Sequence, residues 1–277
     1  MNMSRPIISF STSKGGSGKT TLCIALAGVL ADEGGRVAMI DTDPQQSLTE
    51  WAAKPGRPET IDVFSAQNES DLIDLIEACQ KTHHVTIIDV QGRVSELGNT
   101  AMAWSKLVVV PVQPSAFDAT GAANTIRALA TVQRVRRTQI GYAIVMNRMS
   151  GAIRSRTAKA VASAFEEGHI PVMGHFLDRE AYRVMTASGG TVFTLTDAQA
   201  PGLEKARKES QLFALAVSQR VGLLAASEEA PAAPPSREAI TGAFERADAH
   251  VSAGVDDSSP HLDDELTTAL DAALDAQ

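Results

Sequence analysis

Short runs of β-branched and other apolar residues alternate along the chain with longer segments whose apolar residues recur at helical spacing. Runs such as residues 85–89 (VTIID) and 106–111 (KLVVVP) are apolar without the alternation of a half-exposed strand. Continuous apolar strands are typical of a parallel sheet covered by helices on both faces. The pattern therefore predicts a doubly wound α/β fold with a mainly parallel sheet. Strands are expected at Ile7–Ser11, Val37–Asp41, Ile61–Phe64, Val85–Asp89, Leu107–Val112 and Ile140–Met146.

The most informative motif, Ser13-Lys-Gly-Gly-Ser-Gly-Lys-Thr-Thr21, lies between the first expected strand and the helical segment Leu22–Ala31. Its glycines let successive backbone N–H groups point at phosphate oxygens, and the helix adds the positive end of its dipole. Lys19 can neutralise β- and γ-phosphate charge, and Thr20 can offer its hydroxyl to Mg²⁺. The order of strand, loop and helix predicts a fold of the P-loop NTPase type. Expected nucleotide contacts are Lys14, Gly15, Gly16, Ser17, Gly18, Lys19, Thr20 and Thr21.

Carboxylates end two further expected strands. Asp41 and Asp43 follow the second, and Asp89 closes the run at residues 85–89. Ligands of doubly wound sheets bind beyond the carboxyl ends of the strands, where these side chains would meet the glycine-rich loop. Mg²⁺ prefers oxygen ligands, so Thr20, Asp41 and Asp89 are the predicted metal-site residues. Aspartates are also common in turns after strands, and a purely structural role for Asp89 is the alternative.

The loop departs from the usual G-x-x-x-x-G-K-[ST] pattern, because Ser13 occupies the first glycine position and Lys14 follows it. In this it resembles the deviant loop of the ParA/MinD ATPases. The resemblance implies that Lys14 reaches across a sandwich dimer to phosphates bound by the partner subunit, and that Asp43 orients the attacking water with Asp41 nearer the metal. A second cation there would stabilise the charge of the transferring phosphoryl group. Lys14, Lys19 and Asp43 are therefore the expected catalytic residues.

Other segments extend the resemblance. Val110-Pro-Val-Gln-Pro-Ser-Ala-Phe-Asp118 is similar to the Pro-x-x-Pro-Ser-x-x-Asp segment of the small plasmid-partition ParA proteins. Asn147 ends a strand where that family reads the adenine edge, although it could equally be a turn residue. Val90 and Gln91 depart from the family pattern after Asp89, whereas Gly92 still permits close approach to phosphate. By resemblance, Gly92, Pro114, Asp118 and Arg179 lie near the nucleotide and the dimer interface.

The resemblance spans about residues 5–225 and implies an ATPase that binds ATP and Mg²⁺, forms a homodimer on ATP binding and holds DNA non-specifically. Its stimulating partner would be a centromere-binding ParB/ParG-like adaptor in DNA partition. ParA-like ATPases of T-DNA and conjugative transfer are nearly as similar, notably at residues 95–100, and would act with a relaxase. The Asn-Lys-x-Asp guanine signature is missing, which favours ATP over GTP. A MinD-like membrane regulator is a weaker alternative.

Charge is distributed unevenly along the chain. Its net charge is −8, yet residues 226–277 carry twelve acidic and two basic side chains, so residues 1–225 are slightly basic. We expect an ATPase domain at 1–225, a flexible Ala/Pro/acidic linker at 226–260 and a short acidic amphipathic helix at 261–277. Membrane-targeting helices present a cationic face, so no membrane contact is expected.

A basic surface for DNA phosphates has three possible locations in the sequence, each of which could also be an ordinary solvated face. We favour Arg154 and Arg156 together with Lys205 and Lys208, the last two preceding a helix that runs to Leu224. The three clusters are Arg134, Arg136 and Arg137 at the end of one helix, Arg154, Arg156 and Lys159 at the start of another, and Lys205, Arg207 and Lys208 before the last.

Cellular location is inferred from what the sequence lacks. The N-terminus shows no apolar core of a signal peptide, and no window reaches the roughly 18 apolar residues of a spanning helix. Cys23 and Cys79 stand alone, which suits a reducing compartment and offers no Cys-x-x-Cys metal pair. We expect a cytoplasmic protein associated with the nucleoid or a plasmid.

Overall fold

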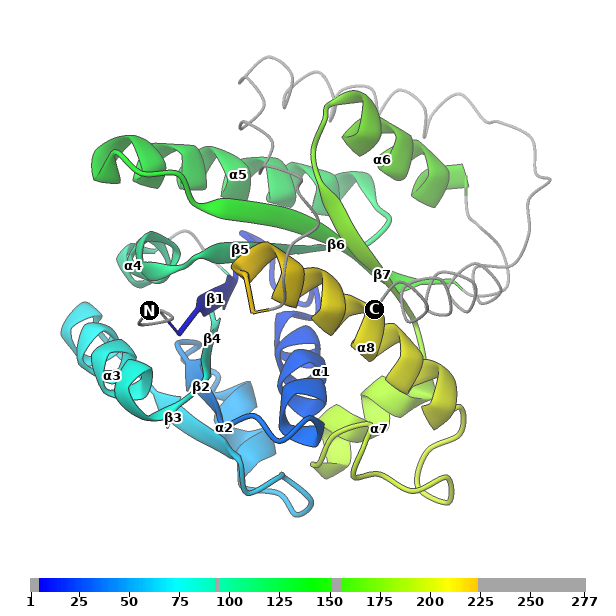
Figure 1. Ribbon diagram of the computed structural model, residues 1–277. Helices are drawn as coiled ribbons and strands as arrows, with labels where there is room; N and C mark the ends of the chain where they lie inside the picture. The colour runs from blue at the N-terminus through cyan, green and yellow to red at the C-terminus, as the bar shows by residue number, and fades with distance from the viewer. Residues whose placement is uncertain (1–4, 93–94, 151–155, 224–277) are drawn as a thin grey trace.

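A seven-stranded parallel sheet forms the centre of the protein (Figure 1). The computed structural model describes residues 5–92, 95–150 and 156–223. Strand order is β3-β2-β4-β1-β5-β6-β7, with helices on both faces, so the predicted doubly wound α/β fold is confirmed. The strands are β1 Ile7–Phe10, β2 Val37–Asp41, β3 Ile61–Ser65, β4 Val85–Asp89, β5 Leu107–Val112, β6 Gly141–Met149 and β7 Val172–Leu177.

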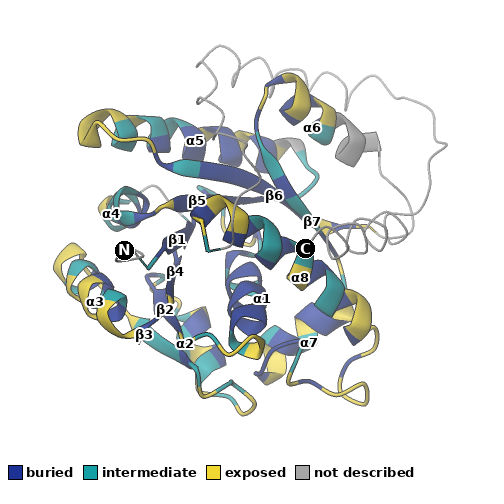
Figure 2. Ribbon diagram, viewed as in Figure 1, coloured by how far each residue is buried: buried dark blue, intermediate teal, exposed yellow. Residues whose placement is uncertain are grey.

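Helices pack against each face of the sheet through separate apolar clusters. Burial is greatest in the strands and in the helix that follows β1, while outer helices keep an exposed face (Figure 2). One face is covered by α1, α2, α7 and α8, and the other by α3, α4, α5 and α6. The bounds are α1 Lys19–Asp32, α2 Ser47–Ala52, α3 Glu69–Thr82, α4 Glu96–Trp104, α5 Ala116–Arg136, α6 Arg156–Glu167, α7 Glu180–Ser188 and α8 Leu203–Val221.

The register of the central strands brings the predicted site residues to one edge. Phe10 at the end of β1 pairs with Asp89 of β4, and Asp41 of β2 pairs with the same aspartate. The loop from β1 to α1 begins directly beyond this point. Parallel strands end at the same edge, which is where an open α/β sheet binds its ligands.

Six strands were predicted to within a few residues, but β7 was missed. Its sequence, VMGHFL, places Gly174 and His175 in the middle of the strand, where they interrupt the apolar run. β7 is the last strand of the sheet and has partly exposed positions, so its pattern is weaker than that of a central strand.

The favoured basic cluster also needs correction. We predicted that Lys205 and Lys208 precede a helix, but the structure places both inside α8. Arg154 and the acidic tail at 226–277 lie outside the described residues, and the predicted linker and terminal helix remain predictions. Across the part of the chain that the structure describes, none of the helices has the length and apolar character needed to span a membrane.

Candidate functional site

The glycine-rich loop closes tightly before α1. Gly16 and Gly18 have φ values of 77° and 89°, a conformation that side chains other than glycine rarely adopt. Added to Gly18, a Cβ would lie 2.1 Å from Nδ2 of Asn147. Gly92 meets the loop from the other side, since a Cβ there would lie 3.1 Å from Cα of Gly15. A Cβ on Gly18 would therefore displace the amide of Asn147, and one on Gly92 would press on the backbone of Gly15.

Ser13, which occupies the position of the usual first glycine, connects the loop to α5. Its hydroxyl donates to the carbonyl of Gly121 at 3.0 Å, and its N–H donates to Oγ1 of Thr125 at 3.0 Å. Gln113 adds a third tie by donating from Nε2 to the carbonyl of Gly16 at 2.7 Å. The departure from the usual motif therefore gives the loop a polar attachment to its neighbouring helix.

Asp89 and Thr20 form the best-defined polar contact of the site. Thr20 Oγ1 donates to Oδ2 of Asp89 at 2.5 Å, and Asp89 is 2% exposed. Oδ1 of Asp89 has no hydrogen-bond partner among the described residues. Burial raises the pKa of Asp89 to about 7, against the opposing effects of Thr20 and Lys19. A buried carboxylate oxygen without a partner, next to a hydroxyl, is a donor set that fits Mg²⁺.

Asp41 lies beside Asp89, but its carboxylate accepts hydrogen bonds from the turn that follows β2. Oδ1 accepts from the N–H of Asp43 at 3.0 Å, while Oδ2 accepts from the N–H groups of Leu48 and Thr49 at 3.1 and 3.0 Å. The residue before α2 supplies no side-chain cap, so Asp41 takes that role. The structure thus shows Asp41 holding the turn that presents Asp43.

Lys14 is half exposed and folds back on its own chain. Nζ lies 2.6 Å from Oδ2 of Asp118, with the lysine side chain 43% exposed and the carboxylate 3% exposed. Ser115 holds this aspartate at the start of α5, because its hydroxyl accepts from the N–H of Asp118 at 3.1 Å. Lys19, by contrast, is 7% exposed at the first position of α1. The two lysines of the loop therefore have different environments.

Asn147 braces the loop through its amide nitrogen, while its amide oxygen is held by its own strand, β6. Nδ2 donates to the carbonyl of Ser17 at 2.8 Å, and Oδ1 accepts from the N–H of Arg148 at 3.0 Å. Contact with an adenine edge stays a prediction. A pocket nevertheless opens beside it, lined by Thr21, Asn147, Arg148, Leu177, Asp178, Arg179, Tyr182, Arg183 and Thr186.

The predicted residue Arg179 lines this pocket, and its partner was missed. Its guanidinium donates from Nε and Nη2 to Oε1 of Glu209 at 3.1 and 2.9 Å. Glu209 is 2% exposed on α8, between Ala206 and Phe213 on the buried face of that helix. A carboxylate on an otherwise apolar helix face was the signal that could have identified it.

The predicted DNA surface is only partly described. Arg156 begins α6, and Lys205 lies exposed in the first turn of α8. Lys208 pairs with Glu204 one turn earlier, at 3.6 Å. These positions stay a prediction, because nothing in the described geometry singles them out from other surface cations. In the same described ranges, no group of three or more His, Cys, Asp and Glu side chains is arranged for a metal.

The fold and the loop together define a P-loop protein of the ParA/MinD type. Residues 5–230 match the sequence model of the VirC1 protein family, and the chain belongs to that family. "Protein ParA" of Rhizobium radiobacter is 31% identical over 217 residues, which cover 78% of this chain and 97% of the relative. "Protein virC1" of Rhizobium rhizogenes is 27% identical, with the same coverage of both chains.

Solved structures show the same fold at low sequence identity. The complex of Cyanothece McdA(D38A) with ATP aligns with a TM-score of 0.65 and 15% identity, covering 78% of this chain and 98% of that chain. MinD of Aquifex aeolicus aligns with a TM-score of 0.60 and 16% identity, covering 76% and 96%. The predicted resemblance to ParA/MinD ATPases is confirmed.

Proposed function

We propose that the chain is an ATP-driven switch of the ParA type that segregates or positions DNA. ATP and Mg²⁺ bind, two subunits close face to face, the dimer holds DNA non-specifically, and a partner protein triggers hydrolysis and release. The observation that carries this proposal is the pair of lysines on one loop, with Lys19 buried and Lys14 on the surface. A buried cation suits the chain's own phosphates, and an exposed one can reach those of a neighbour.

Residues at the strand ends have separate parts in the proposal. Thr20 and Asp89 would hold Mg²⁺, with Asp41 nearer to the metal than Asp43, and the bound ion would offset the charge of the β- and γ-phosphates. Asp43 is proposed to orient the attacking water, and Asp41 keeps Asp43 in place through the turn before α2. The loop amides and Lys19 bind the phosphates, as their position before a helix favours.

The ion pair of Lys14 with Asp118 supports a link between nucleotide and assembly. In the single chain the lysine is neutralised by a carboxylate of charge −1. Reaching the phosphates of a neighbour requires exchanging that carboxylate for the larger negative charge of a triphosphate. We infer that the exchange occurs when two ATP-bound subunits meet, so that hydrolysis depends on dimerisation.

DNA binding and the partner complete the leading proposal. Lys205 and Lys208 of α8, with Arg154 and Arg156, are the proposed contacts to DNA phosphates, and a ParB/ParG-like adaptor is the proposed partner. A second function, promotion of conjugative or T-DNA transfer through a relaxase, is favoured by the VirC1 family match. Affinity capture with the adaptor or relaxase encoded beside the gene would separate the two.

Substitution of Asp43 tests the switch. Asp43→Ala should still bind ATP, lose about 100-fold in hydrolysis rate and remain as a DNA-bound dimer. The measurements are phosphate release, light scattering after size exclusion, and a gel shift on plasmid DNA at two salt concentrations. Lys14→Ala should stay monomeric with ATP, and Asp197→Ala, an exposed loop aspartate, is the matched control. Wild-type hydrolysis by Asp43→Ala would contradict the role given to this residue.

A further inference from the structure

Glu209 is a buried carboxylate on a helix outside the phosphate loop. It is 2% exposed, and burial raises its pKa. Oε1 accepts from Nε and Nη2 of Arg179, and from the N–H of Leu177 at 3.4 Å. Oε2 accepts from the hydroxyl of Tyr182 at 2.9 Å. Burying a carboxylate is costly, and here several donors from one region offset the cost.

All three donor residues belong to one wall of the pocket beside the phosphate loop. Leu177 ends β7, Arg179 precedes α7, and Tyr182 lies in the first turn of α7. Each of them lines the pocket that Thr21 and Asn147 close from the loop side. The same hydroxyl lies 3.0 Å from the carbonyl of Ala206, one turn before Glu209 on α8, so its single hydrogen is shared between two acceptors of that helix. The side chain of Glu209 thus holds the end of β7, the connection from β7 to α7, and the first turn of α7.

We propose that Glu209 is a positioning residue that sets the wall of the pocket against which the base and ribose of the nucleotide lie. This inference rests on the proposed function, because it requires that the loop hold the triphosphate of ATP. Glu209 does not touch the nucleotide; it orients Arg179 and Tyr182, which do the lining. Affinity for the nucleoside part of ATP therefore depends on α8.

The triphosphate part should be independent of Glu209. The phosphate loop is held by other contacts, from Gln113 to Gly16, from Asn147 to Ser17 and from Ser13 to α5. None of these contacts involves α8. A change at Glu209 should therefore lower the affinity for ATP without lowering the affinity for a triphosphate alone. A general loss of folding would lower both.

The test compares Mg-ATP with magnesium and inorganic tripolyphosphate, titrated into the full chain by calorimetry. Glu209→Gln keeps the shape of the side chain but removes its charge, so the paired guanidinium of Arg179 loses its ionic acceptor. We expect the affinity for ATP to fall about tenfold, and that for tripolyphosphate to change by less than about twofold. Tyr182→Phe, which removes one donor and keeps the ring, should lower ATP affinity about threefold with the same selectivity.

Glu204→Gln is the matched control, the same change at a glutamate of α8 whose side chain is 83% exposed. It should leave both affinities unchanged. Equal losses for ATP and tripolyphosphate in Glu209→Gln and Tyr182→Phe would overturn the inference and assign Glu209 to folding alone. Unchanged ATP affinity in both variants would overturn it as well. A wild-type chain that binds neither compound would refute the proposed function itself, a result distinct from either.

Discussion

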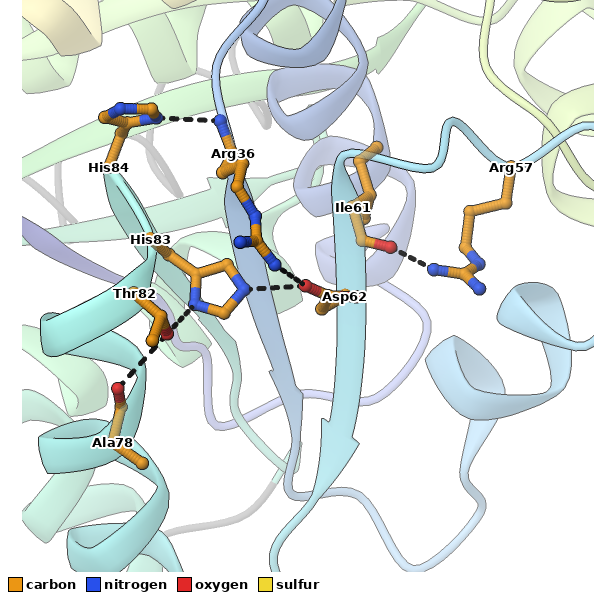
Figure 3. A network of polar contacts seen from close by, with 8 residues as sticks. All are labelled: Arg36, Arg57, Ile61, Asp62, Ala78, Thr82, His83 and His84. Atoms are coloured by element: carbon orange, nitrogen blue, oxygen red, sulfur yellow. Dashed lines mark hydrogen bonds and ion pairs between the residues drawn. The ribbon is translucent and has the colours of Figure 1, made fainter.

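Two aspartates near opposite ends of the parallel strands, Asp62 and Asp89, have opposite environments. Asp62, near the start of β3, accepts from Nη2 of Arg36 at 3.0 Å and lies 2.9 Å from Nε2 of His83 (Figure 3). The histidine is itself held by Thr82, whose Oγ1 lies 2.8 Å from Nδ1. At the carboxyl end of β4, the side chain of Asp89 has one donor, Thr20, and an oxygen without a described partner.

The pKa values of these aspartates move in opposite directions. The hydrogen bond from His83 lowers the pKa of Asp62, with a further contribution from Arg36. Burial raises the pKa of Asp89 to about 7. A carboxylate whose neighbours satisfy it is a structural feature, whereas one left buried with spare acceptor capacity is poised for a cation. The comparison therefore separates a part of the sheet that holds the fold together from the part that we propose binds Mg²⁺ and the nucleotide.

The largest expected effect is the loss of nucleotide from Lys19→Ala. This buried cation is the proposed contact to the phosphates, so its removal should weaken ATP binding by about 100-fold or more. Titration with a fluorescent ATP analogue would measure the loss. The control is Lys81→Ala, which changes an exposed lysine in the last turn of α3, two residues before His83. This variant should bind ATP as the wild type does. If Lys19→Ala binds ATP as tightly as the wild type, the phosphates do not lie against Lys19.

A second prediction compares two glycines with the same backbone conformation. Gly18 and Gly34 have φ values of 89° and 82°, but a Cβ on Gly34 would meet nothing within 4 Å. Gly34→Ala should cost only backbone strain, about 1 kcal/mol of unfolding free energy. Gly18→Ala adds a clash with Asn147, so about 3 kcal/mol is expected, with loss of ATP binding.

Urea unfolding of both variants measures these costs. Asn147→Ala in the Gly18→Ala background removes the clashing amide and should restore part of the stability. Equal losses from the two glycine substitutions would show that the loop yields at Gly18, contrary to the tight closure described above.

Much of this arrangement was predictable from local sequence. The central strands are continuous apolar runs, and the loop is recognised by glycines and lysines at fixed spacing, so both signals lie within a dozen residues. β7 could not be found in this way, because Gly174 interrupts its pattern. Its place in the sheet depends on pairing with β6, which the local pattern does not encode.

Pairings between distant residues were the least predictable part. Arg179 and Glu209 lie 30 residues apart, and His83 lies 21 residues from Asp62. Glu209 stands on an otherwise apolar face of α8, which marks it as buried, but the local pattern does not identify Arg179 as its partner. Asp41 shows a different difficulty, because an aspartate after a strand suits both a metal and a helix cap. Only the geometry of the turn shows that its oxygens cap α2.

The smallest expected effect concerns Asp62→Asn, which removes the charge that Arg36 and His83 share. The side chain of Asp62 is 36% exposed, so solvent screening limits the loss to about 0.5–1 kcal/mol at pH 7. Because the pKa of the folded state is lowered, this stabilisation is present above the ordinary pKa of about 4 and disappears as the pH falls through the folded value. Urea unfolding at pH 7 and pH 3 should show that the difference in unfolding free energy between variant and wild type shrinks at the lower pH.

Asp32→Asn, which changes an exposed aspartate in the last turn of α1, is the control and should differ little from the wild type at either pH. A difference that stays the same at pH 3 would mean that Asp62 acts through packing rather than charge, and the contrast with Asp89 would then lose its electrostatic basis.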